Sequence, residues 1–197
     1  MTKKVPSKKN AKLTKKASSA KTVRNPAGLR AEKPDCKAPY RNPRLSIEKR
    51  VEDLLARMTI EEKTAQLMQT FIGESDNPNN LGSSNFRPTV GSILGFWHGA
   101  KARNEFQRVA VEQTRLGIPI IWGMDVIHGQ RTIFPIPIAQ ACSFNPEITR
   151  TGCDVAARES APEGANWTFA PMVDICRDPR WGRVAEGFGE DPYVGSQ

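Results

Sequence analysis

The fold is decided by two short apolar runs, Ile118-Pro-Ile-Ile-Trp122 and Asn166-Trp-Thr-Phe-Ala170, which are separated by a helical stretch. That helix is expected to begin at Asn145-Pro146, because asparagine is a good N-cap and proline is tolerated at the first helical position. It is expected to end near Ser160. Near-continuous apolar strands joined by a helix indicate right-handed crossovers and a parallel sheet.

The stretch before these runs shows the same alternation. Val90-Gly-Ser-Ile-Leu94 is expected to be a short buried strand. A helix is expected from Lys101 to Arg115, with Phe106 and Val109 facing inward. Alternating strands and helices are typical of the repeating units of an α/β domain.

Two helices and a polar loop are predicted further upstream. Thr59 and Glu62 form a capping box, so a helix is expected from there to about Met68. Residues 73–90 are rich in Gly, Asn and Pro and are expected to form a polar loop. An earlier amphipathic helix is indicated by apolar residues at helical spacing, namely Ile47, Val51, Leu54, Leu55 and Met58.

Two architectures fit this order of elements, an open doubly wound sheet and the first part of a (β/α)₈ barrel. The open sheet would require a glycine-rich phosphate loop after its first strand. Gly95-Phe-Trp-His-Gly99 is not such a loop, and the sequence contains no Walker motif. We therefore predict an α/β fold with about the first three to four strands of a (β/α)₈ barrel. A complete barrel needs about 250 residues, so the domain is expected to be incomplete.

The charge is divided between a basic tail and a mildly acidic body. Residues 1–42 hold 13 basic and 2 acidic side chains, whereas residues 43–197 hold 16 basic and 19 acidic ones. The tail has few large aliphatic side chains and is expected to be disordered. We interpret it as a solvated extension, with a targeting leader or a patch for nucleic acid or acidic membrane as open alternatives. The body is not expected to bind nucleic acid.

The sequence also gives expectations about location and thiol chemistry. No apolar run approaches the roughly 20 residues of a membrane helix, and no signal peptide is visible, so a cytoplasmic location is the default expectation. The four cysteines show no C-x-x-C spacing and are expected to be buried free thiols: Cys36, Cys142, Cys153 and Cys176.

The first candidate site is the segment 122–129, which directly follows the second apolar run. Ligands of parallel α/β folds meet the loops after the carboxyl ends of the strands. Asp125 lies there between Gly123 and Gly129, and its carboxylate suits hydrogen bonding to sugar hydroxyls. The alternative interpretation is that Asp125 caps a short helix.

The second candidate site is the segment 177–193, after the third strand. It holds three arginines, four carboxylates and three aromatic residues. Rigid guanidinium donors and carboxylate acceptors together suit a polyhydroxylated ligand, on which Trp97 and Trp181 would stack. The alternative is a loop that orders itself through internal salt bridges.

Other chemistry has less support. His98 and His128 lack metal-ligand spacing, and His128 is interpreted as a loop residue that makes hydrogen bonds. The sequence has no nucleophile elbow of a serine hydrolase. Asn166-Trp-Thr168 matches a glycosylation sequon, but on a buried strand it is interpreted as a chance match.

Four ordered motifs resemble the N-terminal barrel of glycoside hydrolase family 3, and the closest resemblance is to bacterial-type β-glucosidases. The resemblance covers about residues 45–197. The N-acetylglucosaminidase branch is set aside, because it has Gln-Glu-Gly-Gly where this chain has Val-Ile-His-Gly. The motifs are Val51–Lys63, Gly123–Gly129, Pro171–Arg183 and Glu186–Tyr193.

The resemblance implies retaining hydrolysis of terminal β-D-glucosyl residues by two carboxyl groups about 5–5.5 Å apart, without a cofactor or metal. By motif position, Asp125 and Arg183 are expected to bind the sugar of a β-glucoside or oligosaccharide substrate. Glu186 is expected to hold Arg183 in place.

The same resemblance places the catalytic residues elsewhere. The family's sugar-binding Lys-His pair, its nucleophile and its acid/base residue are expected beyond Gln197, so no catalytic residue is assigned within the chain. We assign no catalytic role to Asp174, Asp178 or Glu190, because nothing in the sequence places them at a catalytic position. The isolated chain is therefore expected to be inactive. The alternative is a non-catalytic carbohydrate-binding or interaction fragment.

Overall fold

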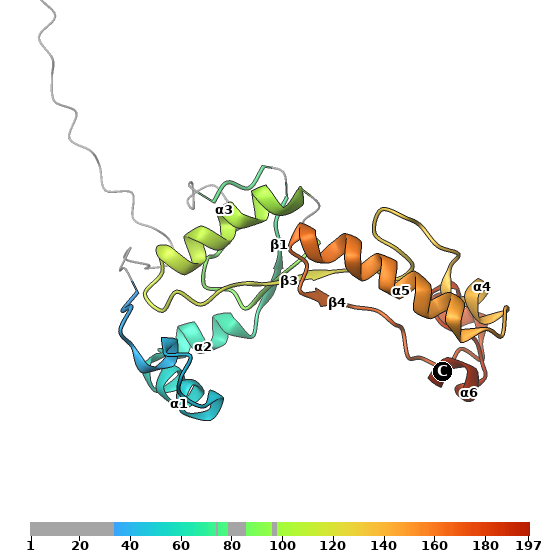
Figure 1. Ribbon diagram of the computed structural model, residues 1–197, viewed down its shortest axis with the longest axis horizontal. Helices are drawn as coiled ribbons and strands as arrows, with labels where there is room; N and C mark the ends of the chain where they lie inside the picture. The colour runs from blue at the N-terminus through green and yellow to red at the C-terminus, as the bar shows by residue number, and fades with distance from the viewer. Residues whose placement is uncertain (1–33, 74, 79–85, 96–97) are drawn as a thin grey trace, which may run out of the picture.

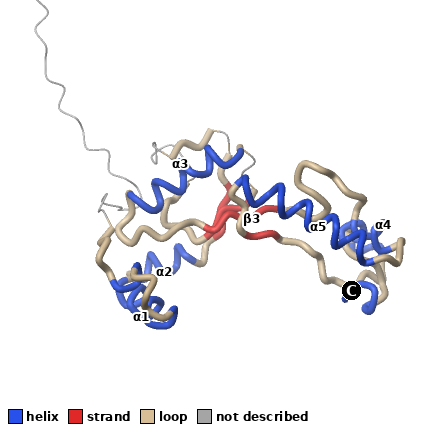
Figure 2. The backbone as a smooth tube through the Cα atoms, in the orientation of Figure 1, coloured by secondary structure: helices blue, strands red, loops and turns tan. Residues whose placement is uncertain are grey.

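One sheet of four parallel strands forms the centre of the structure. The computed structural model describes residues 34–73, 75–78, 86–95 and 98–197. The strands lie in chain order, β1–β2–β3–β4, with the bounds Gln69–Phe71, Ser92–Leu94, Ile121–Met124 and Trp167–Thr168. Figure 2 shows the strands in red at the centre of the molecule. A doubly wound sheet would reverse its strand order at a switch point. The order is sequential here, so the expected α/β fold with the first strands of a barrel is confirmed.

The helices lie on both sides of this sheet and beyond its end. In Figure 1, α1 and α2 lie at the end opposite to α4, α5 and α6, and α5 runs back alongside the segment that follows β4. The α-helices are α1 (Ile47–Arg57), α2 (Ile60–Gln66), α3 (Gly99–Glu112), α4 (Pro137–Ala141), α5 (Pro146–Ser160) and α6 (Pro192–Ser196). Short 3₁₀ helices are η1 (Pro39–Arg41), η2 (Ala161–Glu163), η3 (Pro179–Trp181) and η4 (Val184–Glu186).

The main hydrophobic core lies where α3 packs against the sheet. Phe106 and Val109 are buried in it, as their spacing predicted. The Phe106 ring meets Phe86 edge-on at a centroid distance of 4.8 Å and approaches Trp122 at 6.4 Å. Burying an aromatic or branched side chain contributes about 1.5–3 kcal/mol. The cluster contains Ile72, Phe86, Val90, Ile93, Phe106, Val109, Ala110, Ile120 and Trp122.

The helix starts agree with the sequence signals. The Thr59 hydroxyl accepts a hydrogen bond from the Glu62 amide, and the Glu62 carboxylate accepts one from the Thr59 amide, so the capping box is confirmed. Asn145 caps α5 by accepting from the Glu147 amide. The helix predicted around residues 47–58 is α1, but its apolar stripe is partly exposed, with Ile47 at 70%.

The predicted strand bounds need correction. The run 118–122 forms a strand only from Ile121, because the backbone of Ile120 is paired with the side-chain amide of Gln107 on α3 instead of a neighbouring strand. The strand predicted at 166–170 covers Trp167–Thr168 and is exposed rather than buried, since β4 forms an edge of the sheet in the described part of the chain. The sequon at Asn166 is therefore exposed. β1, with its polar sequence Gln-Thr-Phe, was not predicted.

The expected boundary of the tail at residue 42 is wrong. Residues 1–33 lie outside the described residues, but residues 34–42 are packed against the domain. The Tyr40 hydroxyl is buried and donates to the Leu116 carbonyl at 2.6 Å, and the Tyr40 amide donates to Asp53 at 3.1 Å. The prediction of disorder rested on the small number of aliphatic side chains. The segment is ordered because the ring of Tyr40 is buried and its hydroxyl finds a hydrogen-bond acceptor.

The cysteine expectation is confirmed in part. All four thiols are free. Only Cys176 is buried, whereas Cys36, Cys142 and Cys153 are exposed. Among the described helices, none is long and apolar enough to cross a membrane.

We predict that Tyr40→Phe lowers the free energy of unfolding by about 1 kcal/mol, the usual net value of one buried hydrogen bond. The loss stays modest because Arg41 also donates to the Leu116 carbonyl, at 3.1 Å. Urea unfolding measures the effect. Tyr193→Phe is the matched control, since that side chain is 71% exposed. Equal stability of the two variants would contradict the anchoring role of Tyr40.

Candidate functional site

Asp125 lies at the carboxyl end of β3, as the strand-end argument predicted. Its neighbours Met124 and Val126 are both buried and pack with Ala156 of α5. Successive residues of extended chain point to opposite sides, so the carboxylate of Asp125 lies on the side away from α5, where it is exposed. Residues 126–136 contain no helix, which removes the alternative that Asp125 is a helix cap.

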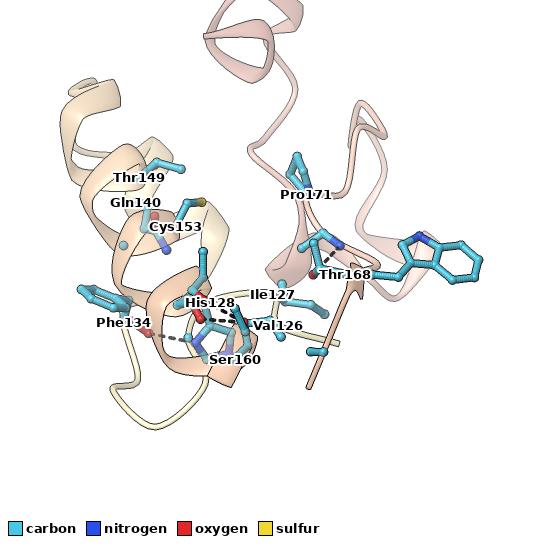
Figure 3. Close-up of a pocket in the computed structure, with 18 of the residues that line it drawn as sticks. Val126, Ile127, His128, Phe134, Gln140, Thr149, Cys153, Ser160, Thr168 and Pro171 are labelled. Atoms are coloured by element: carbon cyan, nitrogen blue, oxygen red, sulfur yellow. Dashed lines mark hydrogen bonds between the residues drawn. The ribbon is translucent and has the colours of Figure 1, made fainter. Parts of the chain in front are cut away.

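The chain after Asp125 forms a tight hairpin, residues 126–134. Gly129 and Ile133 form an antiparallel bridge, and the Phe134 amide donates to the His128 carbonyl at 2.8 Å. The Nδ1 atom of His128 lies 2.8 Å from the Phe134 carbonyl (Figure 3), so this nitrogen carries the proton. The interpretation of His128 as a hydrogen-bonding loop residue is therefore confirmed.

Arg183 and Glu186 form a two-pronged ion pair on the second candidate segment. The distances are 3.0 Å from Nε to Oε1 and 2.5 Å from Nη2 to Oε2. Because the residues are three apart across η4, the short helix itself sets this geometry. The hydrogen bonds with Glu186 hold the pKa of Arg183 above its usual value and the pKa of Glu186 below its own. This arrangement is the one expected for Glu186 as a partner of Arg183.

Charges of opposite sign gather around this guanidinium. After Glu186, the carboxylates of Asp174 and Asp125 make the next contributions that raise the pKa of Arg183. The Asp125 carboxylate of the first candidate segment thus acts electrostatically on Arg183 of the second. A rigid fork of donors beside carboxylate acceptors can bind several hydroxyl groups at once.

The rest of the segment 177–193 is partly ordered by its own polar groups. The loop is closed by the Cys176 amide, which donates to the Gly189 carbonyl at 3.0 Å. Asp178 caps η3 and pairs with Arg180 at 2.5 Å, so the alternative of internal salt bridging holds for this pair. Trp181 is 41% exposed and is accessible for stacking, whereas Trp97 lies outside the described residues.

A cavity of about 460 Å³ lies behind the hairpin, between α5 and the segment after β4 (Figure 3). Its lining is mostly apolar and includes Val126, Ile127, Phe134, Ala156 and Pro171. Neither Asp125 nor Arg183 lines it. The two candidate residues are instead exposed, outside this cavity.

Two carboxylates that hold the hairpin were not found from the sequence. Glu159 and Glu163, at the end of α5 and just after it, accept hydrogen bonds from hairpin residues 130–132. Their partners lie 27 to 33 positions away in the chain, so no local motif indicates them. The described residues contain no group of three His, Cys, Asp or Glu side chains that could hold a metal ion.

Comparison with known proteins gives a consistent picture. A family profile described as the glycosyl hydrolase family 3 N terminal domain matches residues 59–197. A periplasmic β-glucosidase of Salmonella typhimurium is 45% identical over 147 residues, which cover 74% of this chain and 19% of that protein. A xylan 1,4-β-xylosidase of Xylanibacter ruminicola is 31% identical over 80% of this chain and 16% of that protein.

Solved structures agree with this picture. The β-glucosidase of Listeria innocua in complex with glucose has a TM-score of 0.67 and 39% identity, over 77% of this chain and 22% of that one. The chain thus spans about a fifth of the length of the relatives it matches.

We predict that Glu186→Gln removes a contribution to stability that depends on pH. The folded pKa of Glu186 is depressed, so its contribution is present above the usual glutamate value near 4.3 and is lost as the pH falls through the lowered value. The variant and the natural chain should therefore differ at pH 6 and converge toward pH 3. Thermal melts across this range measure the difference, with Glu190→Gln as the control. A difference that does not change with pH would contradict the pairing.

Proposed function

The chain belongs to glycoside hydrolase family 3, through the N-terminal domain of that family, and on this basis we propose that its described part binds the terminal glucose of β-glucosides. Two observations support the proposal: Glu186 holds the Arg183 guanidinium, and the exposed Asp125 carboxylate at the end of β3 acts electrostatically on that guanidinium. Asp125 would accept hydrogen bonds from the sugar hydroxyls, and Arg183 would donate to the ring substituents.

The roles of these residues differ in kind. Asp125 has no hydrogen-bond partner within the described residues, so its carboxylate is available to a ligand. Glu186 already uses both oxygens on Arg183, so it acts by fixing the guanidinium rather than by contacting the sugar. The preference for glucosides follows the β-glucosidases among the relatives, and the xylosidase shows that a related pentose is a second ligand to test.

We further propose that the parent function is retaining hydrolysis of β-glucosidic bonds. In that reaction a carboxylate attacks the anomeric carbon and a carboxylic acid protonates the leaving oxygen. Water then releases the sugar from the enzyme. We assign neither role within these 197 residues, because the resemblance implies that both residues lie in later parts of the relatives. No cofactor is needed for this chemistry.

We predict that glucose changes the tryptophan fluorescence of the chain, with Trp181, two residues before Arg183, and Trp167 on β4 as exposed reporters. Asp125→Asn should weaken glucose binding at least tenfold, since charged hydrogen bonds contribute about 1.5–3 kcal/mol. Asp154→Asn, an exposed carboxylate on α5, is the matched control. Unchanged affinity in the Asp125 variant would reject the proposed role, and a parallel titration with xylose tests the sugar preference.

We also predict that the 197-residue chain alone does not hydrolyse an aryl β-glucoside. Release of the chromophore, followed with and without Asp125→Asn, measures this. Turnover that depends on Asp125 would show that the catalytic carboxylates lie within these residues after all. Glucose binding without turnover is also what the alternative of a non-catalytic carbohydrate-binding fragment predicts.

A further inference from the structure

The hairpin 126–134 is attached to the end of α5 by a cluster of hydrogen bonds. The Glu159 carboxylate accepts from the Arg131 amide at 2.8 Å, the Thr132 amide at 2.8 Å and the Thr132 hydroxyl at 2.7 Å. Glu163 accepts from Gln130 Nε2 at 2.9 Å and pairs with Arg131 at 2.7 Å. Two carboxylates therefore hold three consecutive residues at the tip of the hairpin.

The position of Glu159 is unfavourable for the helix itself. It lies in the last turn of α5, where the helix dipole is negative and favours cations over carboxylates. Its pKa is nevertheless lowered, first by the Thr132 hydroxyl and then by the amides of Thr132 and Arg131. The contacts with the hairpin thus stabilise a charge that the helix end disfavours. This side chain serves the attachment of the hairpin and not the stability of the helix.

The hairpin connects the two halves of the proposed sugar site. Its first residue follows Asp125 directly, and the chain after it leads through residues 135–136 into α4. α4 packs against η4, the short helix that carries the Arg183–Glu186 pair. One path of contacts from Asp125 to Arg183 therefore runs through the hairpin and then through the contact of α4 with η4. A second path runs through the pairing of β3 with β4 and the chain that follows β4.

We propose that Glu159 is a positioning residue for the sugar site. By fixing the tip of the hairpin to α5, it acts together with the direct contact of α4 with α5 to set where α4 lies, and hence how the Arg183–Glu186 pair lies relative to Asp125. It does not contact the sugar. The inference rests on the proposed function, because it needs Asp125 and Arg183 to bind the same ligand.

Glu159→Gln tests the proposal, since the amide keeps the shape but turns an NH₂ group toward donor N–H groups. Glu147→Gln, a glutamate in the first turn of the same helix, is the matched control. Two quantities are measured well below the melting temperature of every variant: amide hydrogen exchange of residues 126–134, and glucose affinity by tryptophan fluorescence.

We expect faster exchange at residues 131 and 132 in Glu159→Gln, together with about fivefold or greater loss of glucose affinity, as is usual for coupled sites. The control should leave both unchanged. Thr132→Val replaces the hydroxyl with a methyl group and keeps the amide, and its effect on affinity should not add to that of Glu159→Gln, because both variants break the contact between the hydroxyl and the carboxylate.

The outcomes separate this inference from the proposed function. Faster exchange with unchanged glucose affinity would overturn the positioning role. Unchanged exchange would overturn the attachment itself. If the natural chain binds no glucose, the proposed function and the positioning role fail together, while the exchange measurement still decides whether Glu159 holds the hairpin.

Discussion

The parallel pairing of β3 on both of its sides is the constraint on which the rest of the structure depends. Ser92 to Leu94 of β2 pair with one side of it, and Trp167 and Thr168 of β4 with the other. The side chain of Asn166 extends this pairing by accepting from the Trp122 amide at 2.8 Å. Because β3 is hydrogen-bonded on both sides, the position of its last residue, Met124, is fixed. The position of Asp125, which follows directly, is fixed with it. Arg103 supports β3 from α3, buried against the Trp122 ring and Met124.

Local signals in the sequence predicted the helices better than the strands. A capping box or an Asn-Pro pair involves residues within one turn, so its outcome depends little on the rest of the chain. The bounds of a strand depend on which groups form hydrogen bonds with its backbone. Gln107, which is 13 positions from Ile120, takes the hydrogen bonds that a longer β3 would need. β1 has no apolar run at all, and only its pairing with β2 makes it a strand.

The contrast between local signals and contacts of distant residues also applies to the candidate site. The position of Asp125 at the end of a strand could be predicted from parallel topology, and the pairing of Glu186 with Arg183 from the position of both residues in a motif of the family that the chain resembles. The contacts of Glu159 with Thr132 span 27 positions, so they follow from the fold and from no pattern in the sequence. The candidate residues Asp125, Arg183 and Glu186 were therefore accessible to sequence analysis, whereas the carboxylates that hold the hairpin 126–134 were not.

The apolar cavity of about 460 Å³ beside α5 has a consequence for the hydration of the molecule. Small side chains on the inner face of the helix, such as Gly152, Ala156 and Ala157, leave this space unfilled, and the cavity is open on one side. Water therefore reaches apolar side chains that would otherwise be packed, and the free energy gained from burial is proportional to the apolar area removed from water. The half of the structure that contains α5 thus gains less from the hydrophobic effect than the densely packed half around α3.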